Sequence, residues 1–103
     1  MSARTVMPNR RDAMTFDVFF QGKVFHISFG TFHPGMVSEV FISSEKTSND
    51  VADAARDAAV ALSIAAQYGT PIEVIRADVT RDENGAPCSV VGAVLDAIAE
   101  QLT

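Results

Sequence analysis

The sequence contains one cysteine, no tryptophan and two histidines among 103 residues, and this scarcity narrows its chemistry. A single thiol, Cys88, excludes an internal disulfide and a zinc site built from several cysteines. No segment reaches the ~20 consecutive apolar residues that a membrane-spanning helix requires. Residues 1–16 lack the apolar segment of a secretory signal, so we expect a cytoplasmic protein.

Motifs that carry common enzyme chemistry are also missing. The chain has no glycine-rich phosphate loop, no nucleophile elbow and no HExxH metal motif. His26, His33 and Glu39 offer one set of metal ligands, but the pattern favours a strand histidine, a turn histidine and a solvated Glu39 on the outer sheet face. Cys88 precedes a predicted helix, where a thiol pKa can fall, yet no histidine base is near it in sequence. We therefore expect no enzyme activity, no catalytic residue, no metal and no cofactor.

The charge is distributed unevenly along the chain. Residues 1–13 carry Arg4, Arg10 and Arg11 against Asp12, whereas the remaining ninety residues carry five basic and twelve acidic side chains, a net charge of −7. We predict a flexible basic arm over residues 1–13 and a single domain over residues 14–103. The acidic domain disfavours direct binding to nucleic acid and suits a protein partner with a basic surface.

Three segments between residues 15 and 42 have the period of two that is typical of strands. They cover residues 15–20, 23–29 and 36–42, and the turns at Gln21-Gly22 and residues 30–35 separate them. These connections are too short for crossovers, so an antiparallel meander is predicted. The apolar residues expected to face the core are Phe16, Val18, Phe20, Phe25, Ile27, Phe29, Met36, Val40 and Ile42.

After residue 49 the apolar period changes to 3.6, which predicts helices over residues 50–68, 71–79 and 89–102. Asn49 or Asp50 caps the first helix and Gly69 ends it. Thr70-Pro71-Ile72-Glu73 is a capping box for the second helix, and Ser89 caps the third. Residues 80–88 read as a loop. Strands followed by helices predict a two-layer α+β domain with the three helices packed on one face of the sheet. The predicted core stripe of the first helix is Val51, Ala54, Ala55, Ala58, Leu62, Ala65 and Ala66.

Two regions carry more apolar surface than this two-layer monomer can bury. The second half of the first helix is apolar nearly all round, and several apolar strand residues, Val24 and Val37 among them, fall on the outer sheet face. Either the helices wrap both sides of the sheet, or a second chain covers the remaining apolar surface. Of the two, we predict a homodimer, with an interface that includes Val60, Leu62, Ile64, Phe19 and Phe41.

The chain resembles the TSCPD domain, a module found at the C-terminus of some bacterial ribonucleotide reductases and in shorter bacterial and phage proteins. The resemblance covers roughly residues 10–101. It rests on Arg10-Arg11, Thr15-Phe16, Ser38–Ile42, Ala55–Ala59, Leu62-Ser63, Gly69, Thr80–Asp82, Asn84–Ser89 and Gly92. It implies an α+β accessory module associated with nucleotide metabolism, and not a reductase, whose catalytic barrel needs several hundred more residues.

The name-giving Thr-Ser-Cys-Pro-Asp motif of that family is missing here. In the aligned stretch, residues 92–99, Val94 stands in place of the cysteine and Leu95 in place of the proline. The metal or nucleotide binding suspected for cysteine-bearing members is therefore not carried over to this chain.

Three functions from different classes remain open at this point. The leading hypothesis is a non-enzymatic accessory module of the TSCPD-like class that acts through protein–protein contacts as a homodimer. The second is a nucleotide-binding regulator linked to ribonucleotide reduction, with an anion site built from Arg81, Asn84, Gly85 and Ser89 at the start of the last helix. The third is a small acidic inhibitor of phage type that covers the basic surface of a nucleic-acid-handling complex.

Overall fold

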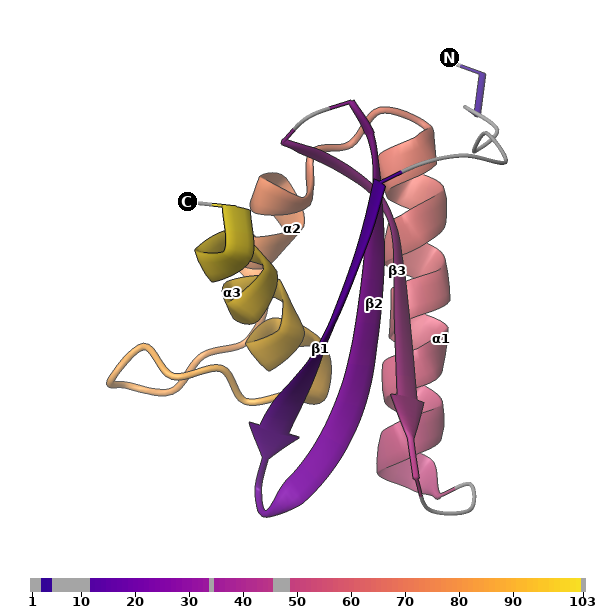
Figure 1. Cartoon of the computed structure of the whole chain (residues 1–103). Coiled ribbons are helices and arrows are strands. Elements are labelled where there is room, and N and C mark those ends of the chain that lie inside the picture. The colour runs from indigo at the N-terminus through magenta and orange to yellow at the C-terminus, as the bar shows by residue number, and fades with distance from the viewer. Residues whose placement is uncertain (1–2, 5–11, 34, 46–48, 103) are drawn as a thin grey trace.

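The computed structural model describes residues 3–4, 12–33, 35–45 and 49–102. Three strands precede three helices (Figure 1), namely β1 (Asp12–Phe20), β2 (Lys23–His33), β3 (Met36–Ser44), α1 (Asp50–Gln67), α2 (Ile72–Asp78) and α3 (Val90–Leu102). The strands form an antiparallel meander in the order β1-β2-β3. The predicted α+β fold is confirmed, and the predicted ends of the helices differ from the observed ones by at most one residue.

The predicted boundary between arm and domain lies slightly too late in the chain. Asp12 and Ala13 already belong to β1, where they pair with Thr31 and Gly30 of β2. Residues 5–11 of the predicted arm, with Arg10 and Arg11 among them, lie outside the described residues. The sheet therefore begins before residue 14.

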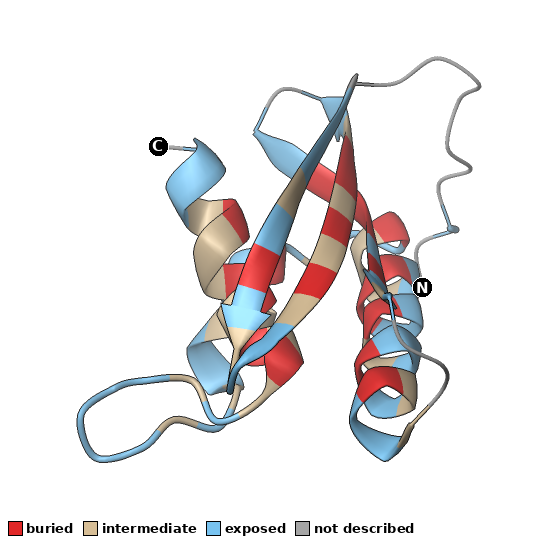
Figure 2. Ribbon diagram, turned by 60° about the horizontal axis from the view of Figure 1, so that its bottom comes forward, coloured by how far each residue is buried: buried red, intermediate tan, exposed pale blue. Residues whose placement is uncertain are grey.

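The inner face of the sheet supplies most of the core. Phe25, Ile27 and Phe29 of β2 alternate along the strand and are at most 2% exposed, as the predicted period of two requires (Figure 2). Phe16 of β1 meets Phe29 edge to face, with ring centroids 6.0 Å apart. The predicted tight turn between β1 and β2 is present, because Gln21 and Gly22 both have positive φ, as a two-residue hairpin turn demands.

The alternation in β3 is interrupted, and two sequence-based expectations fail for this reason. Gly30 pairs with Glu39 but Thr31 pairs with Val37, so Ser38 is an extra residue on β3. This bulge turns Val37 into the core and leaves Met36 exposed, the reverse of the prediction. Glu39 is only 7% exposed instead of solvated. Its carboxylate occupies the space beside Gly30, where an added Cβ would lie 2.8 Å from Glu39 Oε1.

The helices begin and end largely where the sequence predicts. Asn49 Oδ1 accepts a hydrogen bond from Ala52 N at 2.9 Å, and Ser89 Oγ accepts one from Gly92 N at 3.1 Å. The predicted capping box of α2 is wrong, because Pro71 itself is the N-cap residue and no side chain caps this short helix. Among the described residues, no helix combines the length and the apolar character needed to cross a bilayer.

The three helices cover the inner face of the sheet, and α1 and α3 contact each other but pack on different strands. α1 packs along β3, whereas α3 contacts β1 on the other side (Figure 1). The buried side of α1 is rotated relative to the predicted stripe. It consists of Ala52, Ala55, Ala59, Leu62, Ser63 and Gln67. The rotation turns polar side chains of α1 toward β3.

Candidate functional site

Polar side chains of α1 cover the edge of the sheet at β3. Ser63 Oγ accepts a hydrogen bond from Val40 N at 2.8 Å and donates one to Val40 O at 3.0 Å. Gln67 Nε2 donates to Ser38 O at 3.0 Å, and Arg4 Nε donates to Gln67 Oε1 at 2.6 Å. These hydrogen bonds give partners to backbone N–H and C=O groups of β3 that would otherwise be unpaired at the edge of the sheet. They hold α1 firmly in place against β3.

Directly beside these bonds, apolar side chains from two elements gather on the surface. Phe41 of β3 is 55% exposed, and Val60 and Ile64 of α1 are 54% and 37% exposed. All three line one hollow of about 260 Å³, together with Arg4 and others. We call the surface formed by Phe41, Val60 and Ile64 the α1–β3 seam. The structure thus brings together three of the five predicted interface residues.

The other two predicted interface residues lie elsewhere. Phe19 is 75% exposed near the β1–β2 turn, and it does not line the hollow at the seam. Leu62 is 5% exposed and belongs to the core of the chain. Leu62 is therefore corrected from an interface residue to a core residue, because the rotation of α1 points this position at the sheet.

The outer face of the sheet carries a histidine between two carboxylates. His26 Nδ1 lies 2.7 Å from Asp17 Oδ1, and His26 Nε2 lies 3.2 Å from Glu45 Oε1. The hydrogen bond to Asp17, with a smaller effect of Glu45, raises the pKa of His26 above its usual 6.5. The contact links the outer sides of β1, β2 and the residue after β3.

The arrangement around His26 predicts a measurable titration. We expect NMR titration of the His26 ring protons to give a pKa above 6.5 in the wild type and a lower pKa in Asp17→Asn. The contacts that raise the pKa of His26 also stabilise the folded state. This stabilisation is fully present below the unfolded-state pKa of 6.5 and is lost as the pH rises through the higher folded-state pKa. Glu45→Gln serves as the control, with a smaller fall in the pKa. Equal pKa values in the wild type and Asp17→Asn would contradict the contact.

The loop predicted to bind an anion is held together by hydrogen bonds within the chain. Arg81 Nη1 and Nη2 donate to the two Asp96 oxygens at 2.9 and 2.8 Å, and Nη1 also donates to Gly85 O at 3.1 Å. The backbone N of Asn84 donates to Asp82 Oδ1 at 2.8 Å, so Asn84 lies in an ordinary turn. Ser89 caps α3. Arg81 and Ser89 therefore hold the loop in place, and anion binding there stays a prediction without support from the geometry.

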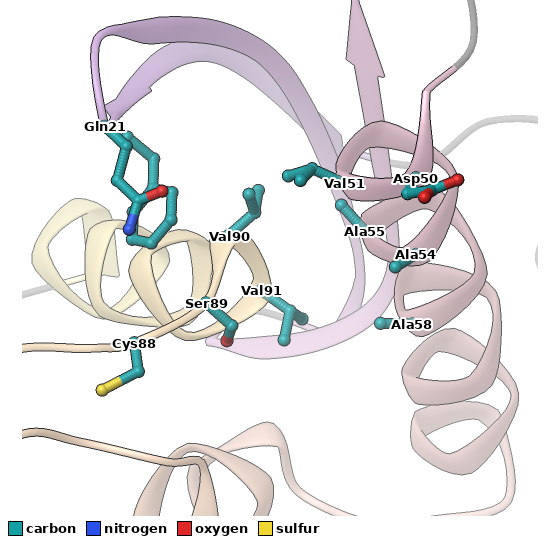
Figure 3. A pocket seen from close by; sticks show the side chains of 11 residues that line it. Gln21, Asp50, Val51, Ala54, Ala55, Ala58, Cys88, Ser89, Val90 and Val91 are labelled. Atoms are coloured by element: carbon teal, nitrogen blue, oxygen red, sulfur yellow. The ribbon is translucent and has the colours of Figure 1, made fainter.

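A groove between the starts of α1 and α3 was not predicted from the sequence. Its volume is about 460 Å³, and Val51, Ala54 and Ala58 of α1 face Val90 and Val91 of α3 across it (Figure 3). Cys88, whose side chain is exposed, lies at its rim with Ser89. We call this cavity the α1–α3 groove. Val51, Ala54 and Ala58 were expected in the core and line the groove instead.

The described residues form no recognisable metal centre, and the chain has no match among known proteins. Over the described residues, no group of three or more His, Cys, Asp or Glu side chains is placed to hold a metal ion. No protein-family model, no curated protein and no solved structure matches this chain. Functional inference therefore rests on the seam, the groove and the charges around them.

Proposed function

We propose that this protein is a non-enzymatic binding module that acts through protein–protein contacts and forms a homodimer across the α1–β3 seam. The observation that supports the proposal most directly is the gathering of exposed Phe41, Val60 and Ile64 at one place. Apolar patches that polar residues surround are typical of interaction sites. In a two-fold dimer the same residues of both chains are buried against one another.

The rigidity of the seam supports this proposal further. The hydrogen bonds of Ser63 and Gln67 to β3 fix the position of α1 relative to the strand. Val60 and Ile64 are therefore presented with Phe41 on one ordered platform, which lowers the entropy cost of association. A contact surface of this kind needs no catalytic group.

Substitution at the centre of the seam tests the homodimer. We expect Val60→Asp to raise the dimer dissociation constant at least tenfold, because the dimer would bury an unpaired carboxylate in an apolar contact. Sedimentation equilibrium over a concentration series measures this constant. Val74→Asp is the matched control, since Val74 of α2 is also 54% exposed and lies outside the seam. A wild-type chain that stays monomeric throughout, or equal effects of the two variants, contradicts the proposal.

The structure offers little support for the nucleotide-binding alternative. Arg81, the one cation of the predicted loop, is bound by Asp96, and acidic Asp50 is one of the residues that line the adjacent α1–α3 groove. Both features disfavour a phosphate group. The relation to the TSCPD domain and the role as an acidic inhibitor stay predictions, and either is compatible with a binding module.

A further inference from the structure

The α1–α3 groove is an apolar surface separate from the seam, and it extends along α1. A second hollow of about 300 Å³ shares Ala58 and Val91 with it and adds Ala61, Ala65 and Ile75. Between Val51 and Ala65, α1 rises about 21 Å at roughly 1.5 Å per residue. The continuous groove is thus three to four helical turns long, and its α1 wall is made mainly of small side chains.

The surroundings of this groove are acidic. Residues 49–102 contain nine acidic and three basic side chains, and neither lysine nor histidine. All three arginines form ion pairs within the chain, Arg56 with Asp53 and both Arg76 and Arg81 with Asp96. Among the described residues, no cation lines either part of the groove, whereas acidic Asp50 is one of the residues that line it.

A second acidic residue, Asp57, is exposed on α1 although it lines neither hollow. Asp57 lies seven residues after Asp50, which places both on the same side of the helix, two turns apart. Neither side chain forms an ion pair among the described residues. The groove therefore has an apolar interior beside an acidic side of α1, whose negative charge is left for a partner to neutralise.

From this combination we infer that the α1–α3 groove binds a cationic amphipathic helix of another protein. The apolar side chains of that helix fill the groove at positions i, i+3, i+4 and i+7, and its lysine or arginine side chains lie over Asp50 and Asp57. The inference does not depend on the homodimer, because the seam and the groove lie on different sides of α1.

The composition of the groove selects a helix over an extended peptide. An extended segment needs hydrogen-bond partners for its backbone when it is buried. The part of the groove around Ala61, Ala65 and Ile75 is lined only by alanine, leucine, isoleucine and valine side chains, which offer none. A helix satisfies its own backbone internally. The small alanine side chains also permit close approach of a partner helix to α1.

Three synthetic peptides test the inference with the full chain. The first is a 16-residue helix with leucine at the four groove positions and lysine on the flanks, the second replaces each lysine by glutamate, and the third scrambles the first. We expect fluorescence anisotropy to show at least tenfold tighter binding of the first peptide than of either other. Raising the salt concentration should weaken its binding several-fold because the acidic charges of α1 become screened.

A pair of variants locates the binding site. Ala61→Arg places a bulky cation in the groove, and we expect it to weaken binding of the lysine peptide at least tenfold. Ala77→Arg is the matched control, because exposed Ala77 of α2 lines neither part of the groove. We expect a change of less than threefold there. Circular dichroism of both variants verifies that they are folded.

Several outcomes overturn the inference, and all but the last leave the homodimer across the seam untouched. Equal binding of the lysine and glutamate peptides removes the charge argument, and equal binding of the scrambled peptide reduces the effect to nonspecific attraction. Equal effects of Ala61→Arg and Ala77→Arg place the site elsewhere. Absence of binding at millimolar peptide also rejects it. Loss of self-association in Ala61→Arg assigns the groove to a second copy of this chain instead.

Discussion

Replacement of Ser63 by alanine is expected to lower the free energy of unfolding by roughly 2–4 kcal/mol. The hydroxyl of Ser63 accepts from Val40 N and donates to Val40 O at the edge of β3. Both strand groups lose their partner in the variant, and each unsatisfied buried group costs roughly 1–3 kcal/mol. Urea denaturation followed by circular dichroism measures the change. Small domains are typically stable by only ~5–15 kcal/mol, so the loss is large.

An exposed serine of β3 itself provides the control for this effect. Ser43 is exposed on the outer face of β3, and we expect Ser43→Ala to change the free energy of unfolding by less than ~0.5 kcal/mol. Hydrogen exchange of the Val40 amide should become faster in Ser63→Ala only. The assignment of Ser63 as the edge cap fails if the two variants have equal stability and Val40 remains equally protected.

Ser63 shows why the orientation of α1 was not predictable from the apolar periodicity of the sequence. The apolar periodicity predicts that residues such as Val51 and Ala54 are buried. It reflects only the burial of apolar side chains and says nothing about hydrogen-bond partners. The backbone groups at the edge of β3 also need hydrogen-bond partners, and Ser63 and Gln67 of α1 supply them. The helix therefore rotates, and Val51 and Ala54 turn toward the groove. Sequence reasoning missed the groove for this reason.

Short-range sequence signals were sufficient to predict the order of the strands and helices and the residues near which they begin and end. Asn49 caps α1, Gly69 ends the helix with a positive φ of 107°, and Gln21-Gly22 forms the predicted turn. Each of these depends on a few neighbouring residues. The bulge at Ser38 depends on how two strands pair, which the residues of one strand alone do not specify. It reverses the sides of Met36 and Val37.

The candidate interface was predicted in part. Exposure of Phe41, Val60 and Ile64 followed from an excess of apolar residues over the available core. Their proximity did not, because Phe41 is nineteen residues from Val60 and meets it only through the packing of α1 on β3. Leu62 could not be separated from Val60 and Ile64 in a segment that is apolar nearly all round. The tertiary packing made that distinction.

Asp96 is the second position where a single substitution should have a large effect. Its carboxylate accepts hydrogen bonds from Arg81 of the loop after α2 and from Arg76 Nε of α2, the latter at 2.8 Å. The hydrogen bond from Arg81 is the main cause that lowers the pKa of Asp96 from 3.8 to about 2, with Arg76 adding to it. We expect Asp96→Asn to lower the free energy of unfolding at neutral pH by about 2 kcal/mol.

A double-mutant cycle with Arg81→Gln separates this ion pair from other effects. We expect the combined loss in the double variant to be smaller than the sum of the two single losses, because each single variant already breaks the same contact. Arg56→Gln is the control for loss of a surface arginine, since Arg56 forms only an exposed pair with Asp53 at 3.6 Å. Additive losses would show that Asp96 and Arg81 act separately.

The pH dependence of this difference identifies the carboxylate as its source. A folded-state pKa of about 2 lies below the unfolded value near 3.8, so the stabilisation by Asp96 is fully present above pH 4. It decreases as the pH falls, because protonation of the unfolded chain begins first, and most of it is gone near pH 2. Urea denaturation of the wild type and Asp96→Asn should therefore differ by about 2 kcal/mol at pH 7 and converge near pH 2. A difference that stays constant over this range would mean that Asp96 acts through packing and not through its charge, and that the loop after α2 is held by other contacts.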